Sequence, residues 1–205
     1  MTSEPAQDRR VRRTRAALMR AAITLVTERG TAAVAISDIA AAADISRQAM
    51  YQQFGDRDTL LLAAAVDLAQ RELLPRAAET SAAVTGRDRA LAVARHFAGH
   101  RVFYRALLTG SCAFGLNRAL GELLLPINRQ AVERLAGERL DAHTVEDLAA
   151  FVTGGAATLV NTWLVDGDDP LDPEEFTDRL MRTMSIVTAA MREPDSIARA
   201  GEHDR

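Results

Sequence analysis

Residues 36–54 read Ile-Ser-Asp-Ile-Ala-Ala-Ala-Ala-Asp-Ile-Ser-Arg-Gln-Ala-Met-Tyr-Gln-Gln-Phe, and this stretch decides the fold of the N-terminal part of the chain. It holds two short helical patterns separated by a break at Asp44 and Ile45. The first pattern is made of small or apolar residues, so a second helix can cross it closely. Ser46 can cap the second pattern because its hydroxyl can accept a hydrogen bond from a free backbone N–H. The stretch therefore predicts two short helices that cross around a tight turn.

The second pattern carries long polar side chains on one face, at Arg47, Gln48, Tyr51 and Gln52. Its small and apolar residues are left to face inward. A recognition helix in the DNA major groove presents donors and acceptors of this kind to the base edges. The stretch thus predicts a DNA-reading helix-turn-helix. An ordinary pair of surface helices with one polar face has the same spacing and stays an alternative.

Five motifs in and around this stretch resemble the N-terminal domain of the TetR family of transcriptional regulators, over roughly residues 10–66. They are Thr-Glu-Arg-Gly at 27–30, Asp-Ile-Ala at 38–40, Ile-Ser-Arg at 45–47, Met-Tyr-Gln-Gln-Phe at 50–54 and Phe-Gly-Asp-Arg-Asp-Thr-Leu at 54–60. Several anchors at the family's spacing are more specific than one short motif. The resemblance implies contacts to DNA, which we assign to Arg13, Ser37, Ser46, Arg47, Gln48, Tyr51, Gln52 and Arg57.

Three positions depart from the family pattern. Ala35 stands where the family has a Thr or Ser N-cap, so the cap is missing unless Thr31 or Ser37 substitutes for it. Asp44 replaces the family's turn glycine, and Asp tolerates a left-handed conformation better than most residues. Arg57 replaces the family's phosphate-contacting lysine, which keeps the charge and adds a planar donor fork. We therefore expect the turn and the phosphate contact to persist.

Positive charge gathers in the N-terminal part of the chain. The net charge is −3 over 205 residues, but residues 1–55 hold eight arginines against five acidic residues. Positive charge thus lies where DNA contact is expected. We predict a flexible basic arm at 1–10, a DNA-binding domain at 11–55 and a helical regulatory and dimerisation domain at 56–205. A disordered soluble tail is the alternative for the arm, whose basic cluster extends into the first helix: Arg9, Arg10, Arg12, Arg13 and Arg15.

Cysteine count and hydropathy bear on the compartment. A single cysteine excludes an intrachain disulfide and suits a reducing compartment. We recognise neither an apolar run near the ~18 residues of a membrane span nor a signal-peptide core. We therefore expect a cytoplasmic protein with no membrane association.

The whole chain shows helical periodicity and lacks the alternating pattern of strands, so the predicted fold class is all-α with about nine helices. Gly30 should end the first helix, and Asp56 should cap the fourth. Further helices are expected near 88–99, 101–109 and 115–139, the last kinked at Pro126. Capping patterns predict one helix that starts at Thr144 with Asp147 and another that starts at Asp172 with Pro173.

The last two helices pair with their copies in TetR-family dimers, so the resemblance implies a homodimer. A two-fold protein also matches a palindromic operator, whose half-sites lie about 34–36 Å apart. Packing within one chain is the alternative role for the small residues of these helices. We assign the dimer interface to Phe151, Gly155, Leu159, Phe176, Leu180, Met184 and Val187.

Aromatic and polar residues among the aliphatic helices are candidates for a small-molecule pocket, because such pockets are mostly apolar with a few placed polar groups. Plain core packing is the alternative for most of the aromatics. His96 and His100 could instead hold a metal if Cys112 or a nearby acid completed the site, and Cys112 could be a redox switch or an inert buried thiol. We predict no metal and no cofactor, and a pocket lined by Phe97, His100, Phe103, Tyr104, Cys112, Phe114, Asn117, Asn161 and Trp163.

Together these patterns predict a homodimeric transcriptional regulator that leaves a palindromic operator when a small molecule binds. A repressor is preferred to an activator. Two alternatives are carried forward. One is a helical protein-binding module that does not bind an operator. The other is an enzyme that binds Mg²⁺ and diphosphate through Asp168, Asp169 and Asp172, although these carboxylates also suit a solvated loop that ends in an N-cap.

Overall fold

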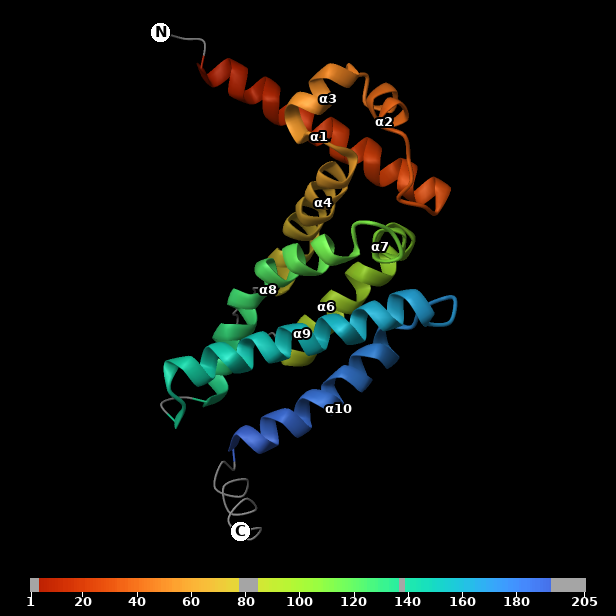
Figure 1. The fold of residues 1–205 in the computed structure, drawn as a ribbon. Coiled ribbons are helices and arrows are strands. Elements are labelled where there is room, and N and C mark those ends of the chain that lie inside the picture. Colours follow the sequence, from red (N-terminus) through yellow and green to blue (C-terminus); the bar gives the residue numbers. More distant parts are fainter. Residues whose placement is uncertain (1–3, 78–84, 137–138, 193–205) are drawn as a thin grey trace, which may run out of the picture. The chain divides into compact units, whose positions relative to one another are not determined.

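The computed structural model describes residues 4–77, 85–136 and 139–192, and all regular structure in those ranges is helical (Figure 1). The predicted all-α fold class is confirmed. The chain divides into two compact units, one of Met1–Leu74 with Gly99–Leu120 and one of Pro75–Ala98 with Gly121–Arg205. Its elements are α1 (Glu4–Arg29), α2 (Ile36–Ala42), α3 (Arg47–Phe54), α4 (Arg57–Leu68), the π-helical turn η1 (Ala69–Leu73), α5 (Leu74–Ala77), α6 (Gly86–Gly99), α7 (Arg101–Leu108), α8 (Ala113–Ala136), α9 (Ala142–Asp166) and α10 (Pro173–Arg192).

The first unit is built around α1, which packs against α2, α4 and α7. Leu18 and Val26 of α1 are fully buried, as are Ile39 of α2, Met50 of α3 and Leu60 of α4. Burying such side chains stabilises a domain by roughly 1.5–3 kcal/mol each. This apolar centre therefore holds the two short helices, which are too short to be stable alone.

Both ends of α1 bear on the sequence predictions. Gly30 ends the helix as expected, with a φ of 65° and its N–H donating to the Val26 carbonyl at 2.9 Å. At the other end, helix begins at Glu4, so residues 4–10 continue α1 instead of forming a flexible arm. Good helix formers and the Asp8–Arg12 ion pair at i,i+4 spacing favour this continuation.

The rod formed by α4, η1 and α5 shows how the chain accommodates Pro75. The ring of a helical proline clashes with the carbonyl four residues earlier. Here the preceding turn widens to π geometry, and the Leu74 N–H donates to the Ala69 carbonyl five residues back. With this rod taken as one helix, the described ranges contain the predicted nine. The rod's first part is buried against α1, which is why the first unit extends past the predicted boundary at residue 55.

The second unit contains α6, the C-terminal part of α8, and the neighbouring helices α9 and α10. Trp163 of α9 stacks on Phe176 of α10 with ring centroids 4.2 Å apart. Asp172 caps α10 by accepting from the Glu174 and Glu175 N–H groups, as the sequence predicts. α8 runs through Pro126, and the kink predicted there stays a prediction.

The predicted start of α9 is wrong. Asp141, not Thr144, is the N-cap, and it accepts from the Thr144 backbone N–H at 2.8 Å and from the Thr144 hydroxyl at 3.0 Å. The patterns Asp141-x-x-Thr144 and Thr144-x-x-Asp147 overlap in the sequence, so both Asp141 and Thr144 are suitable N-cap residues. The helix begins three residues earlier than expected because the negative charge of Asp141 is stabilised at the positive end of the helix dipole, which a neutral threonine cannot match.

The sequence analysis recognised no apolar run near the length of a membrane span. In the described ranges one helix, α9, is long and apolar enough to cross a membrane by length and composition, and 28% of its most apolar window is buried within the chain. Core helices of soluble proteins pass the same test, so this property by itself assigns no membrane role.

Candidate DNA-binding interface

The turn between α2 and α3 adopts the geometry that the sequence predicts. Asp44 has a φ of 54°, in the left-handed region that the family's glycine would occupy. The next residue, Ile45, donates its N–H to the Ala40 carbonyl at 2.9 Å, which folds the chain back across α2. Ser46 then caps α3, since its side-chain oxygen accepts from the Ala49 N–H at 3.2 Å. The turn thereby aims the start of α3 outward.

The start of α2 lacks the side-chain cap, as expected for Ala35. The suggested substitution by Thr31 or Ser37 is wrong. Thr31 Oγ1 accepts from the Ala33 N–H, and the Ser37 hydroxyl donates to Asp38. Both hydroxyls are therefore used locally, one before the helix and one within it. Ser37 stays exposed on the surface where DNA contact was predicted.

The outward face of α3 carries the predicted base-reading side chains. Met50 and Phe54 are buried on its inward face. On the other side, Tyr51 is 51% exposed and its polar neighbours are exposed as well. None of the hydrogen bonds and ion pairs found among the described residues uses the side chains of Arg47, Gln48, Tyr51 or Gln52. These donors and acceptors are thus available to another molecule.

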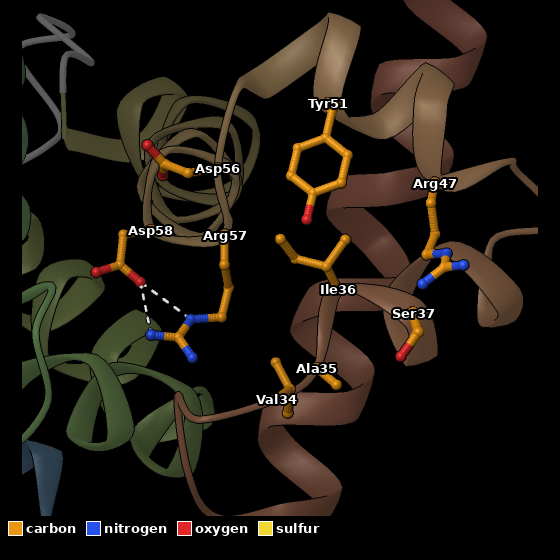
Figure 2. Close-up of a pocket in the computed structure, with 9 residues that line it drawn as sticks. All are labelled: Val34, Ala35, Ile36, Ser37, Arg47, Tyr51, Asp56, Arg57 and Asp58. Carbon is orange, nitrogen blue, oxygen red and sulfur yellow. Dashed lines mark hydrogen bonds and ion pairs between the residues drawn. The ribbon is translucent and has the colours of Figure 1, made fainter.

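A concave site of about 640 Å³ lies beside this face (Figure 2). Its lining brings together arginine, hydroxyl and carboxylate groups from α2, α3 and α4. The carboxylates are engaged within the chain, Asp56 by the Thr59 N–H and Asp58 by Ser111 and Arg57. The arginine and hydroxyl donors therefore suit an anionic ligand, because such N–H and O–H groups bind phosphate oxygens. The residues that line it are Val34, Ala35, Ile36, Ser37, Arg47, Tyr51, Asp56, Arg57 and Asp58.

Arg57 is held at the edge of this concave site by the neighbouring Asp58. Its Nε and Nη2 each lie 3.0 Å from Asp58 Oδ1. The other carboxylate oxygen accepts from the Ser111 hydroxyl at 2.6 Å. The Ser111 hydrogen bond, followed by the contacts with Arg57, keeps the pKa of Asp58 below its ordinary value despite some desolvation. Asp58 is accordingly a carboxylate at neutral pH.

Arg15 has a role that the sequence interpretation missed. The sequence analysis placed it in the basic cluster that extends from the arm into the first helix, but its Nη1 donates to the Gln53 carbonyl at 2.6 Å. Its guanidinium also lies over the Phe54 ring, 4.1 Å from the centroid. Arg15 therefore binds the C-terminal end of α3, while Arg13 stays exposed on α1. Arg15 and Arg13 are two residues apart, so they lie on opposite faces of a helix. That spacing is the one sequence signal that could have separated their roles.

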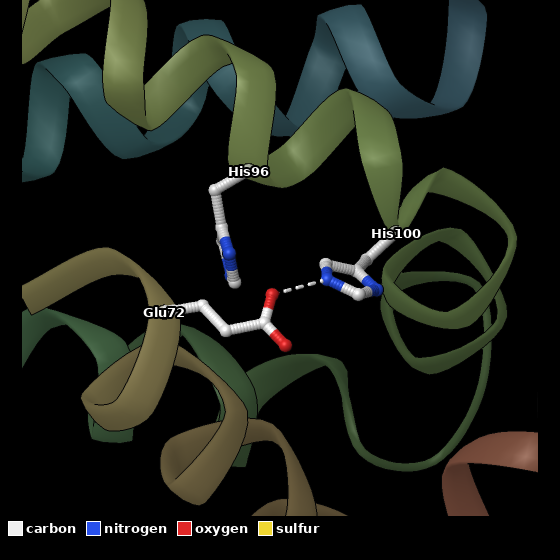
Figure 3. A group of neighbouring side chains, drawn as sticks. All are labelled: Glu72, His96 and His100. Carbon is white, nitrogen blue, oxygen red and sulfur yellow. Dashed lines mark hydrogen bonds and ion pairs between the residues drawn. The ribbon is translucent and has the colours of Figure 1, made fainter.

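Several residues of the predicted small-molecule pocket are packed together in the first unit. His100 Nε2 lies 2.7 Å from Glu72 Oε2. Figure 3 draws this contact as a dashed line and also labels His96. Phe103 and Tyr104 are fully buried and meet edge to face at 5.4 Å. Burial, aided by the Glu72 carboxylate, raises the pKa of Tyr104 well above its usual value near 10. This is a packed aromatic group whose polar contacts include His100 with Glu72 and the Tyr104 hydroxyl with the Ala65 carbonyl at 3.5 Å.

The other pocket residues of the first unit are less suited to a closed site. Phe114 is 82% exposed, and the Asn117 side chain donates to the Ala113 carbonyl of its own helix. Cys112 is buried, and burial together with the Asp58 charge raises the pKa of its thiol. The redox-switch alternative required a lowered pKa, so this environment favours the inert thiol.

In the second unit the remaining predicted residues are spread over two helices. Phe97 of α6 is buried, as is Trp163 of α9, and Asn161 is half-buried. Trp163 is committed to its stack on Phe176. The assignment of these residues to a pocket stays a prediction.

The predicted dimer face needs one correction. Phe176 is 2% exposed and Leu180 is 8% exposed, because their own unit already covers them. They cannot offer much surface to a second copy. The rest of the set is at least partly accessible, with Phe151 67% exposed, and Ile186, which the sequence interpretation did not include, is 73% exposed. The accessible members of the set are Phe151, Gly155, Leu159, Met184 and Val187.

The capped turn, the exposed polar face of α3 and the packing of both short helices on α1 define a helix-turn-helix protein. Residues 18–64 match the family described as "Bacterial regulatory proteins, tetR family". This match, together with the relatives and solved structures below, supports a TetR-family transcriptional regulator.

Named relatives agree with this assignment. The chain is 38% identical over 115 residues to the HTH-type transcriptional repressor Rv3405c of Mycobacterium tuberculosis and, equally, to the HTH-type transcriptional regulator Mb3439c of Mycobacterium bovis. The aligned part covers 54% of this chain and 57% of each relative, little more than half of their length. These relatives are named as regulators and not as enzymes.

Solved structures support the fold across both units. A TetR-family regulator from Rhodococcus sp. is similar with a TM-score of 0.59 and 20% identity, covering 86% of this chain and 98% of that one. The TetR-family repressor AlkX from Dietzia sp. gives a TM-score of 0.56 at 21% identity, covering 85% of this chain and 97% of that one. At such identities the likeness concerns the fold alone.

Proposed function

We propose that this protein is a sequence-specific DNA-binding transcriptional regulator that acts in the cytoplasm as a repressor on a palindromic operator. The observation that carries the proposal is the outward row of Arg47, Gln48, Tyr51 and Gln52 on a helix whose start is capped and whose inward face is buried. A rigid helix that presents such side chains at its N-terminal end is what base reading in the major groove requires. Arg57 and the exposed Ser37 supply backbone contacts beside it.

A homodimer is part of the proposal, and α9 supports it. The helix is apolar enough to pass for a membrane span, yet its own chain buries only 28% of the most apolar window. In water such a surface favours a protein partner. A second copy covers it symmetrically, since a two-fold interface uses the same patch on both subunits. A Cβ at Gly154 or Gly155 would meet none of the described residues within 4 Å, which leaves room for a partner helix.

Release of the operator by a small-molecule effector completes the proposal. Solved structures of this fold match both the N-terminal helix-turn-helix and the helices that follow it, which supports a second, regulatory role for the C-terminal helices. An effector acts by binding one conformation better than the other, which shifts the population away from the DNA-binding form. The effector pocket of the proposal lies among the residues that the sequence predicts for it.

The decisive experiment is a selection of genomic fragments by the purified protein at two salt concentrations, with Arg47→Ala in parallel. The expected result is enrichment of one palindrome by the natural protein and its loss in the variant. Binding at low salt without enrichment of any sequence contradicts operator recognition. No binding at either salt favours the protein-binding alternative, and affinity capture of partners then becomes the next measurement.

The enriched fragment also allows the effector to be tested. A fluorescent copy of the palindrome is bound at saturation, and a library of small molecules is screened for loss of anisotropy. Compounds that release the palindrome without unfolding the protein support the ligand-responsive mechanism. A compound that releases DNA only together with loss of circular dichroism does not.

A further inference from the structure

The turn between α7 and α8 contacts the DNA-binding part of the first unit at short range. A Cβ on Gly110 would come within 3.4 Å of the Ala32 side chain, in the connection between α1 and α2. A Cβ on Gly115 would come within 2.7 Å of the Leu62 side chain on α4. Gly110 lets the turn, and Gly115 lets the start of α8, lie against these neighbours. Between them, Ser111 donates its hydrogen bond to Asp58 at the start of α4.

Asp58 divides its two oxygens between this turn and the concave DNA-side site. Oδ2 accepts from Ser111 at 2.6 Å, and Oδ1 accepts from both Nε and Nη2 of Arg57. A carboxylate held through one oxygen has a fixed plane, which fixes the direction in which the other oxygen points. The orientation of the Arg57 guanidinium therefore depends on a hydroxyl that lies 53 residues away from Asp58 in the sequence.

Arg57 keeps donors for a ligand while Asp58 holds it. A guanidinium has five N–H groups in a rigid fork, and Asp58 uses one edge of it. The remaining N–H groups can reach a phosphate oxygen at the site that Arg57 lines with Ser37 and Tyr51 (Figure 2). A side chain that is already oriented loses less conformational freedom on binding, so its contact is stronger.

We propose that Asp58 is the positioning residue for the phosphate contact of Arg57, and that Ser111 makes this contact responsive to the α7–α8 turn. The proposal rests on the proposed DNA-binding function and names a regulatory input to it. When the turn lies as it does here, Arg57 is aimed at the DNA backbone. When the turn shifts, Asp58 loses its anchor and Arg57 binds phosphate less well, whatever the base sequence.

The test uses Ser111→Ala in the full-length protein, because this change removes one hydrogen bond and leaves the charge unaltered. Ser111 is exposed, so the fold should survive, and the melting temperature checks that it does. Thr109→Ala is the matched control on the same turn, since the Thr109 hydroxyl donates only to the Arg105 carbonyl of its own helix. Ser111→Thr keeps a hydroxyl and serves as the rescue variant.

Affinity is measured for the selected palindrome and for a random duplex at the same salt. Ser111→Ala should weaken binding to both by about three- to tenfold, which corresponds to the roughly 0.7–1.4 kcal/mol that an ordinary intramolecular hydrogen bond contributes. Ser111→Thr should restore most of the affinity, and Thr109→Ala should leave it unchanged. In the Arg57→Ala background, Ser111→Ala should have almost no further effect, because the contact it supports is already gone.

Each contrary result is informative. An unchanged affinity in Ser111→Ala overturns the proposal, and so does an equal loss with and without Arg57, which indicates a merely structural hydrogen bond. Failure of the natural protein to prefer the palindrome overturns operator recognition instead, while the random duplex still tests the positioning of Arg57. Failure to bind either duplex overturns both.

Discussion

The guanidinium of Arg15 lies over the Phe54 ring, 4.1 Å from its centre. A side chain of α1 thereby contacts the last residue of α3. The hydrogen bond from Arg15 to the Gln53 carbonyl adds to this contact. The last four carbonyls of a helix have no partner within it, and a cation at that end also faces the negative end of the helix dipole. Arg15 thus fixes α3 at the end opposite to the Ser46 cap.

Replacing Arg15 by Ala should lower the free energy of unfolding by about 1–2 kcal/mol, from the lost cation–π contact and hydrogen bond. Arg15→Lys should recover only part of this, because an ammonium group lacks the planar face. Urea unfolding followed by circular dichroism measures the difference. Arg13→Ala is the matched control, and a loss of stability as large as that of Arg15→Ala would falsify the special role of Arg15.

Gln48→Ala should cost about 1–3 kcal/mol of binding free energy at one operator position and relax the base preference there. The reason is that Gln48 is exposed at the start of α3, where base edges are reached. Repeating the fragment selection with the variant measures the preference position by position. Gln130→Ala, on α8 of the second unit, is the control, and an unaltered operator preference in Gln48→Ala removes that residue from base reading.

Arg57→Ala should weaken binding to every duplex and reduce the slope of log affinity against log salt concentration by about one unit, since one phosphate contact is lost. Titrations with operator and random duplexes at four or five salt concentrations measure the slope. Arg182→Ala, an exposed arginine of α10, should leave it unchanged. A loss confined to the operator contradicts a phosphate role.

Phe151→Glu should dissociate the proposed homodimer without unfolding the protomer. The Phe151 side chain is 67% exposed in the chain, so the substitution removes little internal packing. In a two-fold interface, however, it places two carboxylates in an apolar contact, which is strongly unfavourable. Sedimentation velocity across a concentration series measures the change. Phe114→Glu, at an even more exposed phenylalanine, should stay dimeric, and dimerisation unaffected by both changes excludes this face of α9.

Because Tyr104 is buried, the free energy of unfolding should fall as the pH rises above about 10. Burial raises the pKa of its phenol, so above about pH 10 the unfolded chain releases a proton that the folded chain keeps. Unfolding is then favoured as pH rises, by up to about 1.4 kcal/mol per pH unit, whereas below pH 10 the group has no effect. Tyr104→Phe should therefore unfold with a shallower dependence between pH 9.5 and 11. Equal urea midpoints for both proteins across that range contradict this account.

Local chemistry is where sequence reasoning worked best. Gly30, Asp44, Ser46 and Asp56 were all predicted to turn or cap the chain, and each does so by a bond or backbone angle that involves residues at most five positions away. Such effects follow from the side chain itself and from its immediate neighbours. The polar face of α3 was equally predictable, because helical spacing alone separates it from Met50 and Phe54.

Contacts between distant segments could not be predicted in this way. The Ser111–Asp58 and Arg15–Gln53 hydrogen bonds join residues that are 53 and 38 positions apart. The sequence around each residue gives no sign of its distant partner. The same limit explains the dimer face. Helical spacing placed Phe176 and Leu180 on an apolar stripe, but it could not show that Trp163 of the neighbouring helix already covers part of that stripe.

The reactivity of the Cys112 thiol can report how often the α7–α8 turn opens. Its thiol is 2% exposed, and a raised pKa keeps it protonated, so a reagent such as a disulfide dye reacts only in molecules whose turn has opened. With reagent in excess, the ratio of the labelling rate in the folded protein to that of the unfolded chain reports the opening equilibrium of this one segment. The protein thus carries a natural kinetic reporter, one residue from Ser111, that needs no engineered label.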